Sequence, residues 1–317
     1  MLPSLDLYLQ HVRVSKRLAT RTVDIYAYEL QALETLCVAQ DLSLTSVQNA
    51  HIRRWIAKAH SAGKGSRSLA LQLSAWRGFY KWLILRGDIL HNPCADIKPP
   101  KAAKPLPKAL GVDAAMALVD FVPPQQLKEG FFERDNLIIE LLYGSGLRVS
   151  ELIALDLDAS PEAMTEGRGW IDAESSEVHV FGKGGKRRMV PLGEKAALAL
   201  QRYLAERHKL CQENSPSDAQ DTALLLGSKG QRLTRYTVWQ ILKVRSLQAG
   251  LDHPVHPHML RHSFASHILQ SSGDLRAVQE LLGHSSIAST QVYTKLDFQH
   301  LARIYDNSHP RAKKGNK

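Results

Sequence analysis

The first 95 residues repeat one pattern, in which apolar side chains recur every three or four positions with polar side chains between them. This spacing gathers the apolar side chains on one face of an α-helix. It predicts four helices: the first begins at Ser4, the second at Thr22, the third at Thr45, and the fourth spans residues 67–85. Ser and Thr are favoured as N-caps, which supports the first three starts. We therefore predict a small helical bundle.

From residue 111 onward the same spacing predicts further helices, with one short β element among them. The helices are expected at residues 131–143, 148–151, 194–209, 234–249, 259–271, 275–282 and 297–305. The runs EVHVF and RRMVPL, separated by GKGGK, are typical of a β-hairpin with a glycine-rich turn. The predicted fold class is mainly α, with a small β-hairpin or sheet in this second part.

The segment DIKPPKAAKPLPKAL, residues 96–110, separates the two parts. It holds four prolines and four lysines, so it cannot continue a helix and is predicted to be an extended basic linker. The expected organisation is a helical domain at 1–95, the linker at 96–110, a second domain at 111–306, and a basic tail at 307–317 without fixed structure.

Charge and cysteine content narrow the function classes. Lys and Arg outnumber Asp and Glu by 41 to 31, and a net charge of +10 favours a polyanionic partner such as nucleic acid. Cys37, Cys94 and Cys211 are odd in number and far apart, as in a protein of the reducing cytosol. We see neither a signal peptide nor a long apolar run for a membrane span, and expect a cytoplasmic protein without membrane insertion.

Several familiar ligand-binding motifs fail on inspection. YGSGLRVSE has Val149 where the dinucleotide fingerprint needs its third glycine, and GKGGKRR lacks the spacing of a P-loop. His258 and His262 stand four apart, but the glutamate of a zinc-protease HExxH motif is missing. No metal and no cofactor are expected.

Cations beside structural breaks, together with one tyrosine, suggest phosphoryl transfer. The residues are Arg148, Lys183, His258, Arg261, His284 and Tyr293. Two guanidiniums can grip the non-bridging oxygens of a phosphodiester, while a tyrosine attacks, a lysine protonates the departing oxygen, and a histidine assists. Each residue also has a simpler explanation: a helix-start salt bridge for Arg148, a solvated turn for Lys183, core histidines at 258 and 262, a surface aromatic at 293.

Four motifs favour the phosphoryl-transfer site over these simpler roles. They are GLRVSEL at 146–152, GKGGKRRMVPL at 182–192, HPHMLRHSFASHIL at 256–269 and LLGHSSIASTQVYT at 281–294. In order and approximate spacing they resemble the tyrosine site-specific recombinases of the phage integrase family, and the similarity covers nearly the whole chain. The resemblance implies six catalytic residues: an arginine clamp of Arg148 and Arg261, Lys183 as general acid, His258 in acid–base work, His284 on the phosphate, and Tyr293 as nucleophile. His262 would be structural. Lys186 remains an alternative to Lys183.

The resemblance also implies how such a protein works. A core-binding domain and a catalytic domain would clamp double-stranded DNA carrying a specific recombination site, and cleavage would pass through a 3′-phosphotyrosine and a Holliday junction without a cofactor. Partners would be a sister tyrosine recombinase in a heterotetrameric synapse and a septal DNA translocase as activator, in resolving chromosome and plasmid dimers at cell division. The helix at 297–305 would dock into a neighbour. An integrase of a mobile element and a non-catalytic DNA-binding architectural protein are the alternatives.

One stretch departs from the family pattern. Residues 158–176 make the connection into the hairpin longer than this family's usual link. We expect this insertion to lie on a surface loop, where added residues cost little.

Overall fold

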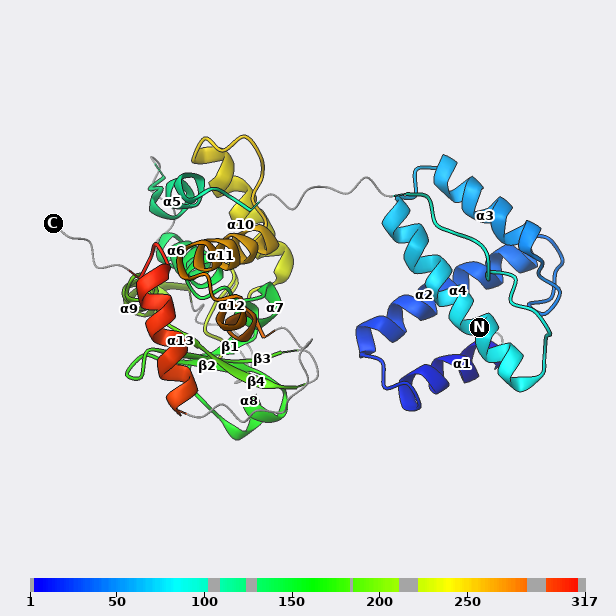
Figure 1. Ribbon diagram of the computed structural model, residues 1–317, viewed down its shortest axis with the longest axis horizontal. Coiled ribbons are helices and arrows are strands. Elements are labelled where there is room, and N and C mark those ends of the chain that lie inside the picture. Colours follow the sequence, from blue (N-terminus) through cyan, green and yellow to red (C-terminus); the bar gives the residue numbers. More distant parts are fainter. Residues whose placement is uncertain are drawn as a thin grey trace. The chain divides into compact units, whose positions relative to one another are not determined.

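A computed structural model of the chain describes residues 3–101, 109–123, 130–182, 185–210, 222–283 and 295–312. The chain divides into two compact units, Met1–Pro105 and Leu106–Lys317. The described residues of the first unit form helices, and those of the second form helices and one small sheet (Figure 1). The predicted fold class is confirmed. Among these residues, no helix combines the length and apolar character that crossing a membrane requires.

The first unit is a helical bundle. Its helices are α1 (Pro3–Val14), α2 (Thr20–Val38), α3 (Asn49–Ser61) and α4 (Ser66–Arg86). α4 packs against the other three, and the indole N–H of Trp76 in its centre donates to the carbonyl of Glu29 at 2.7 Å. α3 begins later than predicted, because the Ser43 hydroxyl accepts from the N–H of Ser46 at 3.1 Å and closes a turn that contains Thr45.

The two ends of the predicted linker are each held by their own unit. Near its start, Arg77 donates to the carbonyl of Ile97 at 2.7 Å, and Ile97 is buried. Near its end, the N–H of Leu110 donates to the hydroxyl of Ser263 at 2.7 Å. Residues 102–108 lie outside the described residues. The domain limits at 95 and 110 therefore stay predictions.

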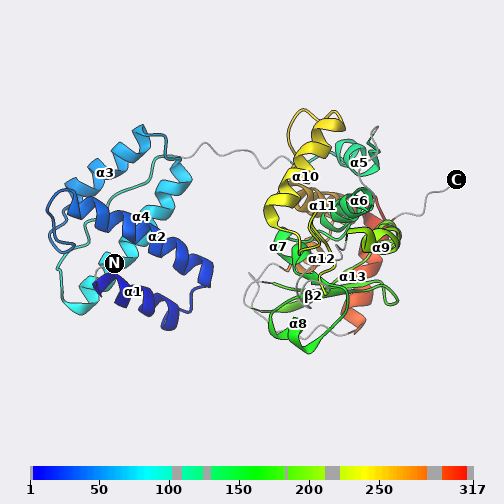
Figure 2. The same ribbon diagram turned by 180° about the vertical axis from the view of Figure 1, so that it is seen from behind.

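The helices of the second unit include a central one, α6. They are α5 (Val112–Asp120), α6 (Phe131–Gly144), α7 (Val149–Ile153), α8 (Pro161–Thr165), α9 (Glu194–Arg207), α10 (Arg235–Gln248), α11 (Pro257–Ser272), α12 (Leu275–Leu282) and α13 (Lys295–Ser308), with a 3-10 turn at His208–Leu210. α5, α7, α9, α10 and α11 all contact α6 (Figure 2). Every residue of α6 from Leu137 to Gly144 is buried, including the charged Glu140.

The sheet of the second unit has the strand order β1-β2-β3-β4. The strands are β1 (Leu155–Asp156), β2 (Gly169–Asp172), β3 (Glu177–Phe181) and β4 (Arg187–Pro191). β3 and β4 are antiparallel, with Val178 opposite Val190, which confirms the predicted hairpin. β2 is antiparallel to β3, and β1 is parallel to β2.

The prediction that residues 158–176 form a surface loop is wrong. They contain α8 and β2, which adds a strand to the predicted hairpin. Trp170 of β2 is buried and stacks on His179 of β3, with ring centroids 4.7 Å apart. The buried Asp156 forms ion pairs with Arg168 and Arg232. Stacking and a buried ion pair give these residues enough fixed contacts to outweigh the entropy of a free loop.

The C-terminal helix also differs from expectation. Leu301 and Tyr305 of α13 are buried against α11 and β4 of their own unit, so the face predicted to dock into a neighbour covers the chain's own core (Figure 1). The side chain of Phe298 lies outside the described residues. Beyond α13, His309 is buried and Arg311 forms ion pairs with Glu140 and Asp120. The predicted tail at 307–317 is thus packed at least as far as Ala312; residues 313–317 lie outside the described residues.

Candidate active site

Arg148 stands where the turn after α6 leads into α7. It is the N-cap residue of α7, and its backbone N–H donates to Glu151 Oε2 at 2.7 Å. Its guanidinium donates to Glu151 Oε1, also at 2.7 Å, and through Nη2 to the carbonyl of Gly283 at 3.3 Å. The side chain remains 30% exposed. The helix-start salt bridge considered from sequence is therefore present, and it still leaves part of the side chain accessible.

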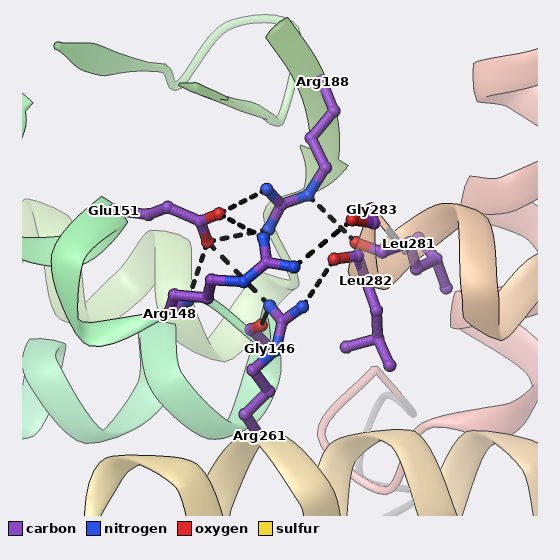
Figure 3. A network of polar contacts seen from close by, with 8 residues as sticks. All are labelled: Gly146, Arg148, Glu151, Arg188, Arg261, Leu281, Leu282 and Gly283. Atoms are coloured by element: carbon purple, nitrogen blue, oxygen red, sulfur yellow. Dashed lines mark hydrogen bonds and ion pairs between the residues drawn. The ribbon is translucent and has the colours of Figure 1, made fainter. Parts of the chain in front are cut away.

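Arg261 reaches the same place from α11. Its neighbours Leu260 and Phe264 are fully buried, which fixes the helix and aims the guanidinium inward. Nη1 donates to the carbonyl of Gly146 and lies 3.9 Å from Glu151 Oε2, while Nη2 donates to the carbonyl of Leu282 (Figure 3). Burial, together with the charges of two nearby arginines, lowers the pKa of Arg261 to about 9. An anion at this place would relieve that repulsion.

Only glycine fits at position 146, between the turn after α6 and the ring of Phe264. Its φ is +60°, in the left-handed region that favours glycine, and an added Cβ would overlap the ring of Phe264. The close approach sets the carbonyl of Gly146 against Arg261. The turn YGSG therefore positions both arginines, one by leading into Arg148 and the other through this carbonyl.

Two polar residues of the site, Glu151 and Arg188, were not among the candidates identified from the sequence. Glu151 is buried and its carboxylate accepts from Arg148 and from Arg188, a residue of β4 (Figure 3). Burial raises the pKa of Glu151, but the hydrogen bonds and charge of Arg188, with the hydrogen bonds from Arg148, outweigh burial and hold the pKa below its ordinary value. The glutamate three residues after a helix-start arginine was a readable signal, as in a capping box. Arg188 sits in a strand far along the chain and gave no comparable signal.

The histidines of α11 and of its N-cap do not share one environment. His256, His258 and His262 are exposed, while His267 is buried between the hydroxyl of Tyr143, 2.9 Å from Nδ1, and the carbonyl of Leu110, 3.0 Å from Nε2. The core role considered for the histidines at 258 and 262 is therefore wrong and belongs to His267. His258 lies one turn before Arg261.

Three of the six predicted catalytic residues lie outside the described residues: Lys183, His284 and Tyr293. The ends of the turn that carries Lys183 are described, and the N–H of Gly182 donates to the carbonyl of Lys186 at 2.8 Å. Lys186 itself is exposed. The assignment of Lys183, rather than Lys186, as the general acid stays a prediction. Within the described ranges, no group of three His, Cys, Asp or Glu side chains is placed to hold a metal ion.

Residues 113–300 match the Phage integrase family, and residues 5–87 match the Phage integrase N-terminal SAM-like domain. The chain belongs to the phage integrase family. Among similar proteins, Tyrosine recombinase XerC 1 of Ralstonia nicotianae is 49% identical over 98% of this chain and 94% of its own length. Tyrosine recombinase XerC of Pseudomonas aeruginosa is 42% identical over 100% of this chain and 98% of its own length.

Solved structures of the family share the fold of this recombinase. XerH site-specific recombinase bound to a palindromic difH substrate superposes with a TM-score of 0.65, at 21% identity over 94% of this chain and 82% of that one. A lambda integrase dimer bound to a COC′ core site gives 0.64, at 18% identity over 92% of this chain and 98% of that one. The family assignment makes this protein a tyrosine recombinase, an enzyme that catalyses DNA strand exchange.

Proposed function

We propose that this recombinase cleaves a DNA strand with the hydroxyl of Tyr293 while Arg148 and Arg261 hold the scissile phosphate. One observation carries the proposal: the guanidiniums of the two arginines, which come from different helices, converge on the carboxylate of Glu151. Guanidiniums fixed in this way can bind the two non-bridging oxygens of a phosphodiester and stabilise the charge of the transition state. The exposed side of Arg148 gives the phosphate access.

The remaining roles follow the family motifs. The Tyr293 oxygen forms a bond to phosphorus, the bond from phosphorus to the 5′-oxygen breaks, and Lys183 supplies the proton that the 5′-oxygen takes. His258 assists in removing the tyrosine proton, for which its exposed place one turn before Arg261 is suitable. His284 would bind the phosphate. The 3′-phosphotyrosine keeps the bond energy, so rejoining needs no added cofactor.

The biological reaction that we propose is resolution of chromosome and plasmid dimers at cell division. It would proceed at a specific site on double-stranded DNA through a Holliday junction, in a synapse shared with a sister, XerD-like recombinase in the cytoplasm, with a septal DNA translocase as activator. Support comes from the relatives named XerC and from a net charge of +10, which suits a DNA partner.

The test is covalent trapping on a nicked DNA duplex that carries a bacterial dimer-resolution site. In EDTA, with and without the sister recombinase, the wild type should form a protein–DNA adduct that survives a denaturing gel, and Tyr293→Phe should form none. Tyr28→Phe serves as the matched control, because Tyr28 is an exposed tyrosine of the other unit. Its adduct yield for each bound DNA should equal that of the wild type.

Three results would contradict the proposal or its biological role. An adduct that persists in Tyr293→Phe would assign the nucleophile elsewhere. Tight DNA binding by the wild type without any adduct, on dimer-resolution sites and on mobile-element attachment sites alike, would favour the architectural DNA-binding protein. An adduct on mobile-element sites alone would favour the integrase.

A further inference from the structure

Three arginines bind three successive carbonyl oxygens at the C-terminus of α12 (Figure 3). The donor–acceptor pairs are Arg188 Nε to Leu281 at 3.3 Å, Arg261 Nη2 to Leu282, and Arg148 Nη2 to Gly283 at 3.3 Å. The last carbonyls of a helix have no partner within the helix and carry its negative end. Here the arginines supply those partners in a buried setting, since Leu281 and Leu282 are both buried.

Arg188 differs from the other two arginines in how its nitrogens are used. Nη1 and Nη2 donate to Glu151 at 2.5 and 2.8 Å, and Nε donates to Leu281. Every nitrogen of the guanidinium is thus engaged by the protein, and only 5% of the side chain is exposed. Arg188 therefore has no face to offer a phosphate, whereas Arg148 is 30% exposed.

The backbone leaves room for Arg188 at one particular point. Gly283 has φ +62°, and an added Cβ would lie 2.8 Å from Arg188 Cδ and 3.2 Å from Nε. The glycine that ends α12 thus packs directly on the arginine. Contact through both the guanidinium and the aliphatic stem makes Arg188 the link between β4 and the last turn of α12.

We propose that Arg188 is a positioning residue for strand cleavage: it holds Glu151 and the last turn of α12 together while Arg148 and Arg261 turn to the scissile phosphate. The inference rests on the proposed phosphate-binding role of those two arginines. When their amino groups bind phosphate, the carbonyls of Leu282 and Gly283 lose donors. Arg188 keeps its contact with Leu281, so the chain still enters residue 284 from a fixed point, and Glu151 still orients Arg148.

Charge alone would not serve this purpose. A lysine at position 188 could pair with Glu151, but it has no planar fork to bind both carboxylate oxygens and the Leu281 carbonyl at once. Arg188→Lys should therefore behave more like Arg188→Met than like the wild type. Arg134→Met provides a matched control, because Arg134 is equally buried in the same unit, pairs with Asp135 and donates to the carbonyl of Leu226.

The experiment has two readouts on the full-length protein. Hydrogen exchange of the peptide covering residues 275–283 reports the last turn of α12 without any DNA. In Arg188→Met and Arg188→Lys it should be about tenfold faster, the factor expected for losing one hydrogen bond to a charged group, and unchanged in Arg134→Met. Unchanged exchange in the Arg188 variants would overturn the proposal whatever the DNA assay shows.

The second readout is the rate of adduct formation at saturating DNA. We expect both Arg188 variants to bind DNA like the wild type but to form the adduct about 100-fold more slowly, since small misplacements of reacting groups have effects of that size. Loss of Arg188 also raises the pKa of Glu151, so the acid limb of the rate profile should move to higher pH.

Wild-type rates in Arg188→Met, or an equal loss in Arg134→Met, would refute a positioning role. A wild type that forms no adduct would instead count against Tyr293 chemistry.

Discussion

Arg148 binds Glu151 twice, through its backbone N–H and through its guanidinium, each at 2.7 Å. One carboxylate thereby sets both where α7 begins and where the arginine points. The same carboxylate accepts from Arg188 and lies 3.9 Å from Arg261. Removing a buried anion that compensates three cations lowers the stability of the fold, because positive charges then face one another with little solvent between them.

Replacing Glu151 by Gln should destabilise the second unit by about 3 kcal/mol, the loss typical when one partner of a buried ion pair is removed. Urea unfolding, followed by hydrogen exchange of α6 peptides, would measure this loss for the second unit alone. Glu280→Gln is the control, because its pair with Arg276 is largely exposed and should cost under about 1 kcal/mol. Equal losses in the two variants would contradict the assigned role of Glu151.

The contribution of Glu151 should also depend on pH. Its pKa is lowered in the folded protein from an ordinary value of 4.5, so the unfolded chain binds the proton first. The stabilisation is therefore complete above about pH 4.5 and is lost as the pH falls through the lower folded value. The stability difference between wild type and Glu151→Gln should be constant near neutral pH and shrink below pH 4.5. A difference that stays constant in acid would exclude this linkage.

Gly146 and Gly273 allow a steric effect to be separated from a backbone effect. Both have positive φ, at +60° and +67°, but an added Cβ overlaps Phe264 at the first and meets open space at the second. Gly273→Ala should cost about 1–2 kcal/mol from the backbone alone. Gly146→Ala should cost about 2 kcal/mol more because of overpacking. Urea unfolding of both variants tests this, and partial recovery in Gly146→Ala combined with Phe264→Leu would identify the ring as the obstacle.

Arg311 should anchor the C-terminal segment to its own unit. Its ion pairs reach Glu140, which is buried, and Asp120, so Arg311→Ala leaves a buried carboxylate unpaired. We expect a loss of about 3 kcal/mol and faster hydrogen exchange in residues 305–312. Arg303→Ala, at an exposed position of α13, should change stability by less than about 0.5 kcal/mol. No change in Arg311→Ala would mean that the segment does not pack on its own unit in solution.

Local pattern predicted the long elements well and the short ones poorly. The periodic helices such as α2, α4 and α11 appear close to their predicted positions, because an amphipathic stripe is a local property of ten or more residues. α3 starts later than expected because the Ser43 hydroxyl accepts from the N–H of Ser46 and closes a turn that contains Thr45. β2 was missed because its stability comes from the stack of Trp170 on His179, a neighbour that only strand pairing provides.

The sequence by itself determined the helical bundle, the hairpin, the order of the family motifs and the identity of Arg148 and Arg261 as candidates, since these depend on residue type and spacing along the chain. Only the tertiary structure decided that both arginines meet at Glu151, that Arg188 joins them from a strand, and that α13 covers its own core. Such contacts depend on where distant segments pack, and a buried charge is compensated by whichever partner the fold brings within hydrogen-bonding distance.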